Sequence, residues 1–208
     1  MIKIRGKRYK CPNKWEEVDI NKIVPCETLQ QEIEAMTGAS LAGIKEEQIL
    51  PLITLTSFVE EFYLPEIKCC DVNTESYFKM EEAKKILTQG GRAYKKLYHL
   101  SKLYHPDRTE TVQILSTGIN LLDQINLFLS AYEEMFSYEP EQEEINAGIE
   151  DLSGFSALAT VYNLAGKDLL KIDQVGNSPA VVVYGVLMYE FKQSQYQKRL
   201  NEIRNKRD

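Results

Sequence analysis

Hydrophobic positions recur at heptad spacing near the end of the chain, between Asn177 and Arg204. Seven positions follow the alternating four-then-three step of one helical stripe: Val182, Val186, Tyr189, Gln193, Tyr196, Leu200 and Ile203. Ser178 before Pro179 predicts the helix start, because a serine hydroxyl caps free amides and a proline at the first helical position needs no N–H. We predict one long helix, with its first half buried and its second half narrowing to a seam suited to a partner helix.

A second stripe with the same spacing lies between Thr109 and Phe136. Leu115, Leu122, Leu129 and Phe136 form one column, and Ile125 and Tyr132 form the next. Because the two seams match, we predict that these long helices pack against each other. Two alternatives stay open for each residue, namely burial in the core of this chain and contact with a partner.

Hydrophobic periodicity and helix start and stop residues predict shorter helices along the rest of the chain. They are predicted over Thr28–Met36, Lys45–Tyr63, Tyr77–Leu87, Arg92–Tyr104 and Phe155–Leu164, with a turn or two over Leu169–Val175. Ile2–Ile4 and residues 8–11 flank Arg5-Gly6-Lys7, a pattern typical of a β-hairpin. We predict that Trp15, the single tryptophan, anchors this corner.

The predicted fold class is therefore mainly α, with a short N-terminal β-hairpin. We expect a single helical domain over residues 1–208. Ser137–Glu150 is polar and acidic, and it is the one stretch where a lobe boundary would fall.

Composition narrows the classes of protein that fit. A chain of 208 residues with 43% hydrophobic and 27% charged residues is typical of a globular protein. The net charge of -6 argues against a protein whose main role is to bind nucleic acid, which needs a concentrated positive field. No apolar run is long enough to cross a bilayer, and the N-terminus lacks the apolar core of a secretory signal. We expect a cytoplasmic protein that does not enter a membrane.

The residue types needed for catalysis are scarce. The two histidines are His99 and His105, and neither a glycine-rich phosphate loop nor a GxSxG string occurs. The four cysteines, Cys11, Cys26, Cys69 and Cys70, contain no CxxC pair, and plain thiols are the favoured interpretation over a metal or redox site. We therefore predict no enzyme, no cofactor and no metal site.

Basic residues are concentrated between Lys79 and Arg108, whereas residues 109–166 contain no lysine or arginine. Two interpretations stay open for this asymmetry. The segments form a basic and an acidic docking face, or they are ordinary solvated surfaces.

The string Tyr104-His105-Pro106-Asp107-Arg108 resembles the helix-loop signature of J-domain co-chaperones. The resemblance implies that His105, Pro106 and Asp107 engage an Hsp70. Lys102 and Leu103 depart from the family's order, and the interval from His105 to Ala131 is longer than in J-domains. The string also has a local explanation, in which Pro106 ends one helix and Asp107 or Thr109 caps the next.

Taken whole, the chain resembles tail assembly chaperones of tailed bacteriophages. The resemblance rests on KIRGKRYKCPNKWEEVDINK at the start, on MTG followed by IKEEQIL, on LSKLYHPD, and on AGIEDLSGFSALATVYNLAGKDLLKIDQVGNSPAVVVYGVLMY. It implies a non-enzymatic protein of the host cytoplasm that binds the helical tape-measure protein before the tail tube polymerises around it.

The candidate partner-binding residues are His105, Pro106, Asp107, Tyr189, Tyr196, Leu200 and Ile203. The partner is predicted to be a protein, the tape-measure chain or another phage structural protein, and self-association into a homo-oligomer is a further expectation. The alternatives are a structural component that stays in the virion, such as a connector or internal protein, and a J-domain-like co-chaperone.

Overall fold

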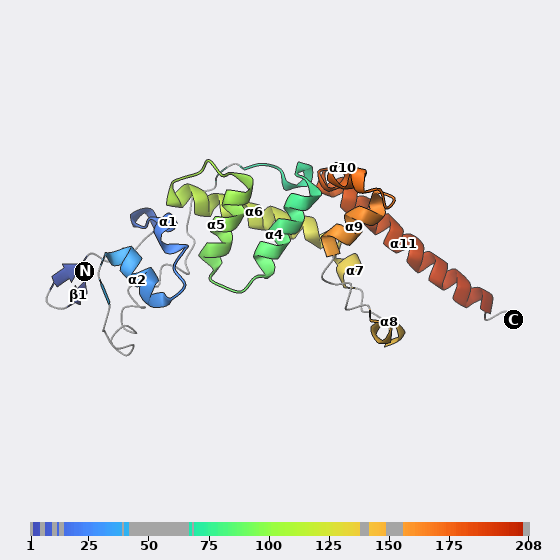
Figure 1. Ribbon diagram of the computed structural model, residues 1–208, viewed down its shortest axis with the longest axis horizontal. Helices are drawn as coiled ribbons and strands as arrows, with labels where there is room; N and C mark the ends of the chain where they lie inside the picture. Colours follow the sequence, from blue (N-terminus) through green and yellow to red (C-terminus); the bar gives the residue numbers. More distant parts are fainter. Residues whose placement is uncertain are drawn as a thin grey trace. The chain divides into compact units, whose positions relative to one another are not determined.

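The computed structural model describes residues 2–4, 7–9, 12, 15–38, 40–41, 67, 69–137, 142–148 and 156–205. This part of the chain is mainly helical, as predicted (Figure 1). It divides into two compact units, unit 1 with residues 1–70 and 86–123 and unit 2 with residues 71–85 and 124–208. The segment 137–150 lies inside unit 2, and the single domain with a lobe boundary there stays a prediction.

Short strands and helices follow one another along the chain. β1 (Ile2–Ile4) and β2 (Lys7–Tyr9) pair antiparallel. The residues between these strands lie outside the described part, so the predicted hairpin stays a prediction. The helical elements are η1 (Trp15–Glu17), α1 (Ile20–Ile23), α2 (Leu29–Thr37), η3 (Val72–Thr74), α4 (Tyr77–Thr88), α5 (Ala93–Tyr104), α6 (Thr111–Ser130), α7 (Glu133–Phe136), α8 (Gln142–Asn146), α9 (Ser156–Leu164), η5 (Leu169–Lys171), α10 (Ile172–Gly176) and α11 (Ala180–Asn205).

Four predicted helices are confirmed, with ends that differ by one residue at most, as α2, α4, α5 and α9. Local chemistry sets their ends. The Thr28 hydroxyl accepts from the Gln31 amide and the Gln31 side chain accepts from the Thr28 amide, while Gly38 ends α2 with φ 70°. The helix predicted over Lys45–Tyr63 lies outside the described residues.

The helix predicted over Thr109–Phe136 is interrupted, which corrects that prediction. α6 ends at Ser130, and the amides of Ala131 and Tyr132 donate to carbonyl groups three residues back, at 3.2 and 3.0 Å. These tighter bonds end the α-helical ladder before α7 begins. The start also moves, because the Ile114 amide donates to the Glu110 carbonyl, which makes Glu110 the cap instead of Asp107 or Thr109.

The last helix begins one residue later than predicted. The Pro179 carbonyl accepts from the Val183 amide at 3.3 Å, so Pro179 is the cap residue and α11 starts at Ala180. The Ser178 hydroxyl donates to the Gln174 carbonyl at 2.9 Å. Ser178 and Pro179 instead form a β-bridge with the Ser76 segment, where proline's missing N–H is not needed.

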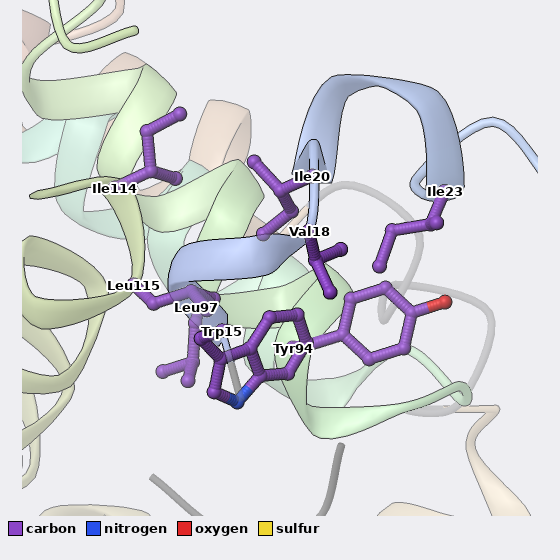
Figure 2. Packing of buried hydrophobic residues seen from close by; sticks show 8 residues of the cluster. All are labelled: Trp15, Val18, Ile20, Ile23, Tyr94, Leu97, Ile114 and Leu115. Carbon is purple, nitrogen blue, oxygen red and sulfur yellow. The ribbon is translucent and has the colours of Figure 1, made fainter. Parts of the chain in front are cut away.

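The core of unit 1 forms where the N-terminal segment meets α5 and α6 (Figure 2). It contains Trp15, Val18, Ile20, Ile23, Tyr94, Leu97, Ile114 and Leu115. The rings of Trp15 and Tyr94 lie 5.7 Å apart, which confirms the predicted anchor. The Thr111 hydroxyl fastens this segment to the start of α6, since it donates to the Val18 carbonyl and accepts from the Ile20 amide.

In unit 2, Tyr184 of α11 is the centre of an aromatic cluster. Its ring lies 5.1 to 5.9 Å from the rings of Tyr77, Phe128, Tyr132 and Phe136. Its hydroxyl donates to the Glu81 carboxylate at 2.5 Å. The end of the Thr109–Phe136 segment therefore contacts the last helix through Tyr132 and Phe136 of its predicted stripe, but on the last helix the contact is Tyr184, which lies outside the predicted stripe.

Candidate protein-binding surface

A row of apolar side chains lies exposed along α11, and we call it the exposed stripe. It consists of Val182, Val186, Tyr189, Tyr196 and Ile203. Each of these side chains has between 42% and 67% of its surface accessible to solvent. Aromatic and branched apolar residues gathered on one helical face are typical of a surface that binds another protein.

The exposed stripe lies on the side of α11 that faces away from the core of unit 2. Ala180, Val183 and Tyr184 are buried, and Phe191 continues their face as a half-buried residue. Val182 and Phe191 are nine residues apart, which is about two and a half turns of an α-helix, so their side chains point in opposite directions. The stripe is thus a second apolar face, and the described part of the chain leaves its five residues exposed.

Two positions of the predicted stripe are not part of the exposed stripe. Leu200 is half-buried, and Gln193 is exposed at the centre of the row but is polar. Beyond Phe191, each residue up to Asn205 is exposed except Gln195 and Leu200, which are half-buried. The second half of α11 therefore presents most of its surface to solvent.

A shallow groove lies near the start of the stripe, within unit 2. It has a volume of about 400 Å³, and its apolar lining includes Leu127, Phe128 and Val181. Leu127 is 75% exposed, the most open apolar side chain of α6. Because Val181 precedes Val182, the groove extends the apolar surface available beside the stripe.

The other predicted site residues, His105, Pro106 and Asp107, follow the end of α5 in unit 1. His105 is the cap residue, and its amide donates to the Ser101 carbonyl at 2.7 Å. Its ring atom Nε2 accepts a hydrogen bond from the Cys70 amide at 3.2 Å, so the half-buried imidazole supports the chain before η3. Pro106 and Asp107 are exposed, and the Lys102 ammonium group donates to the Pro106 carbonyl at 3.4 Å. The first half of the local explanation is confirmed, because α5 ends just before Pro106, whereas Glu110 takes the place of the predicted cap of the next helix.

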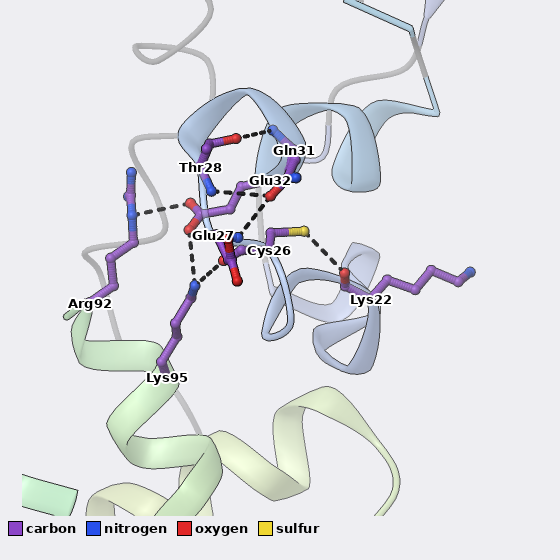
Figure 3. A network of polar contacts seen from close by, with 8 residues as sticks. All are labelled: Lys22, Cys26, Glu27, Thr28, Gln31, Glu32, Arg92 and Lys95. Atoms are coloured by element: carbon purple, nitrogen blue, oxygen red, sulfur yellow. Dashed lines mark hydrogen bonds and ion pairs between the residues drawn. The ribbon is translucent and has the colours of Figure 1, made fainter.

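An ion-pair network that the sequence did not reveal links α2 to α5 (Figure 3). The Glu32 carboxylate is 5% exposed and lies 3.1 Å from Arg92 and 3.6 Å from Lys95. The Lys95 ammonium group also donates to the Cys26 carbonyl. Burial, with the nearby Glu32 carboxylate, raises the pKa of the Cys26 thiol, which favours its protonated form.

The described residues show neither a metal centre nor a membrane span, and similarity adds no further site. Among the described residues, no group of three or more His, Cys, Asp and Glu side chains is placed to hold a metal ion. In the same part of the chain, no helix combines the length and apolar character of a membrane span. A scan of protein-family models found no match, and neither the curated proteins nor the solved structures gave one.

Proposed function

We propose that this chain is a non-enzymatic binding protein that covers an amphipathic helix of a partner protein with the exposed stripe of α11. The observation that carries this proposal is the row of five apolar side chains in helical register, opposite the buried face of the same helix. An amphipathic helix lying along such a row would contact residues at four-then-three spacing.

The apolar surface of the exposed stripe allows an estimate of the binding free energy. Burying a side chain of this size contributes roughly 1.5–3 kcal/mol, so five half-exposed side chains supply about 4–7 kcal/mol. Association costs about 4–15 kcal/mol in lost translational and rotational freedom. The stripe alone would therefore give a weak complex, and further contacts at its edges or in the groove beside Val181 are needed for a stable one.

The resemblance to tail assembly chaperones supports a specific partner, the phage tape-measure protein in the host cytoplasm. A long amphipathic chain exposes apolar surface until it is assembled, and covering that surface prevents aggregation. A chaperone of this kind needs an apolar face that its own core does not use. The exposed stripe meets that requirement.

Two other functions predict different outcomes. A structural virion component would use the same stripe permanently and would remain in finished particles. A J-domain-like co-chaperone would act through Pro106 and Asp107, which are exposed, while the His105 ring is engaged with the Cys70 amide.

The test is a pull-down of the tagged chain from infected host cells, with captured proteins identified by mass spectrometry and purified particles analysed alongside. Tyr196→Glu places a charge in the stripe and should abolish capture. Ser194→Glu is the matched control, since Ser194 is exposed and two residues away, on nearly the opposite side of the helix.

If the chain is the proposed chaperone, it should capture a tape-measure chain. Tyr196→Glu should abolish this capture and Ser194→Glu should not, and purified particles should lack the protein. Abundance in particles would favour the structural role. Capture of an Hsp70 that Asp107→Asn abolishes and Tyr196→Glu leaves intact would favour the co-chaperone. Equal capture by all variants would contradict the use of the stripe.

A further inference from the structure

Charged residues lie along the edges of the exposed stripe. With Val186 and Gln193 at heptad position a, and Tyr189 and Tyr196 at position d, Lys192 and Arg199 fall at successive g positions. Glu190, Gln197 and Arg204 fall at the e positions of the other edge. One edge therefore carries two cations and no carboxylate after Gly185, and the other edge is mixed.

The described part of the chain gives no full explanation for the basic edge. Arg204 lies in the last turn, where a cation complements the helix dipole, but this effect fades within one turn and does not extend to Lys192 or Arg199. Lys192 pairs with the Glu134 carboxylate, and both side chains are more than half exposed, so this pair stabilises the fold little. Arg199 forms no ion pair within the described part of the chain.

The segment from Tyr189 to Asn205 is also basic as a whole. It carries four cations, Lys192, Lys198, Arg199 and Arg204, against two carboxylates, Glu190 and Glu202. The complete chain has the opposite sign, with a net charge of -6. A partner selected by this surface would be acidic where it meets the stripe.

We propose that the occupant of the exposed stripe is an acidic amphipathic helix, with carboxylates beside its apolar row that pair with Lys192 and Arg199. This inference rests on the proposed function and specifies the chemistry of the partner. Gln193 is exposed at the centre of the seam, and a polar residue at one a position fixes the register of paired helices. The partner helix carries a polar residue opposite it.

The same charges disfavour a second copy of this chain as the occupant. In a parallel pair, a g residue faces the e residue five positions later, so Arg199 would face Arg204 of the second copy. In an antiparallel pair, g edges face each other, and Lys192 and Arg199 would meet the same cations of the second copy. Like charges at these positions reduce affinity.

The test uses two synthetic three-heptad peptides that share the same leucine and isoleucine seam with a central Gln. One peptide has Glu at its e and g positions and the other has Lys. Binding to the full chain is measured by fluorescence anisotropy at low and high salt. We expect the Glu peptide to bind roughly five- to tenfold more tightly than the Lys peptide, and the difference to shrink as salt screens the charges.

Charge reversal at the basic edge provides the second measurement. The double variant Lys192→Glu/Arg199→Glu should reverse the preference between the peptides. The control Lys167→Glu/Lys171→Glu makes the same charge change in exposed residues of unit 2 outside α11 and should preserve the preference.

The outcomes separate this inference from the proposed function. Equal binding of both peptides, lost with Tyr196→Glu, would overturn the acidic partner and leave the stripe as a helix-binding surface. Binding of neither peptide would overturn both proposals. Self-association of the chain that Tyr196→Glu abolishes, measured by sedimentation velocity, would overturn the acidic partner in favour of a second copy.

Discussion

Replacing Gly185 with alanine tests whether the exposed face of α11 is open in solution. Gly185 lies between Val182 and Val186, and a Cβ atom added there would meet no atom within 4 Å. Glycine inside a helix costs roughly 0.5–1 kcal/mol relative to alanine. Gly185→Ala should therefore raise the free energy of unfolding by about that amount, which corresponds to roughly 1–4 °C in Tm for a chain of this size.

The same substitution at Gly118 should have the opposite sign. A Cβ atom there would lie 2.4 Å from the carbonyl oxygen of Leu97 and 2.8 Å from its Cα atom, where α6 crosses the backbone of α5. Neither atom can move without shifting α5. Overpacking of this kind costs about 1–3 kcal/mol or more, which exceeds the gain of about 1 kcal/mol in helix propensity.

The assay is urea unfolding of both variants and the parent chain, followed by circular dichroism at low protein concentration. A rise for Gly185→Ala with a fall for Gly118→Ala is the expected pair of results. A fall for Gly185→Ala would refute the reasoning, because it would mean that another chain or another part of this chain packs against that face.

Three further predictions concern the fold. Trp15→Ala should lower the free energy of unfolding by about 3–5 kcal/mol, because it empties a buried site against Tyr94; a loss below about 1 kcal/mol in urea unfolding would contradict that packing. Thr28→Ala should cost about 1 kcal/mol through the lost cap of α2, and Thr28→Ser should restore most of it in thermal unfolding; equal melting of all three would argue against the cap. Burial, assisted by the Glu81 carboxylate, raises the pKa of Tyr77 from 10 to about 12, so its contribution to stability is complete below pH 10 and is lost as pH rises from 10 to 12. Phenolate absorbance of the parent chain and of Tyr77→Phe checks this, and a difference between the two that titrates at the usual value would refute it.

Helix ends were predictable where local residues decide them. Thr28, Gln31 and Gly38 carry a complete start and stop signal within eleven residues, and α2 follows it closely. Ser178 and Pro179 formed an equally good local signal, but the bridge to the Ser76 segment takes up their backbone and moves the start of α11. Contacts between distant segments, which no local pattern encodes, made that difference.

The stripe itself was visible in the spacing, but its exposure was not. The first half of α11 is apolar on two sides, with Val182 and Val186 on one and Val183 and Tyr184 on the other. Periodicity alone does not determine which side faces the core, and the ring contacts of Tyr184 decide it. Glu32 gave no signal, because a glutamate in a helix looks like a surface residue until Arg92 and Lys95 are brought to it.

The most direct test of helix binding by α11 is hydrogen exchange of the full chain, measured by mass spectrometry with and without its captured partner. The second half of α11 is largely exposed, and a helix of that length is only marginally stable without packing, so its amides should exchange quickly in the free chain. Slower exchange over Val182–Asn205 on binding, with α5 unchanged, is the predicted result. Protection confined to other segments, with α11 unchanged, would contradict the stripe as the binding surface.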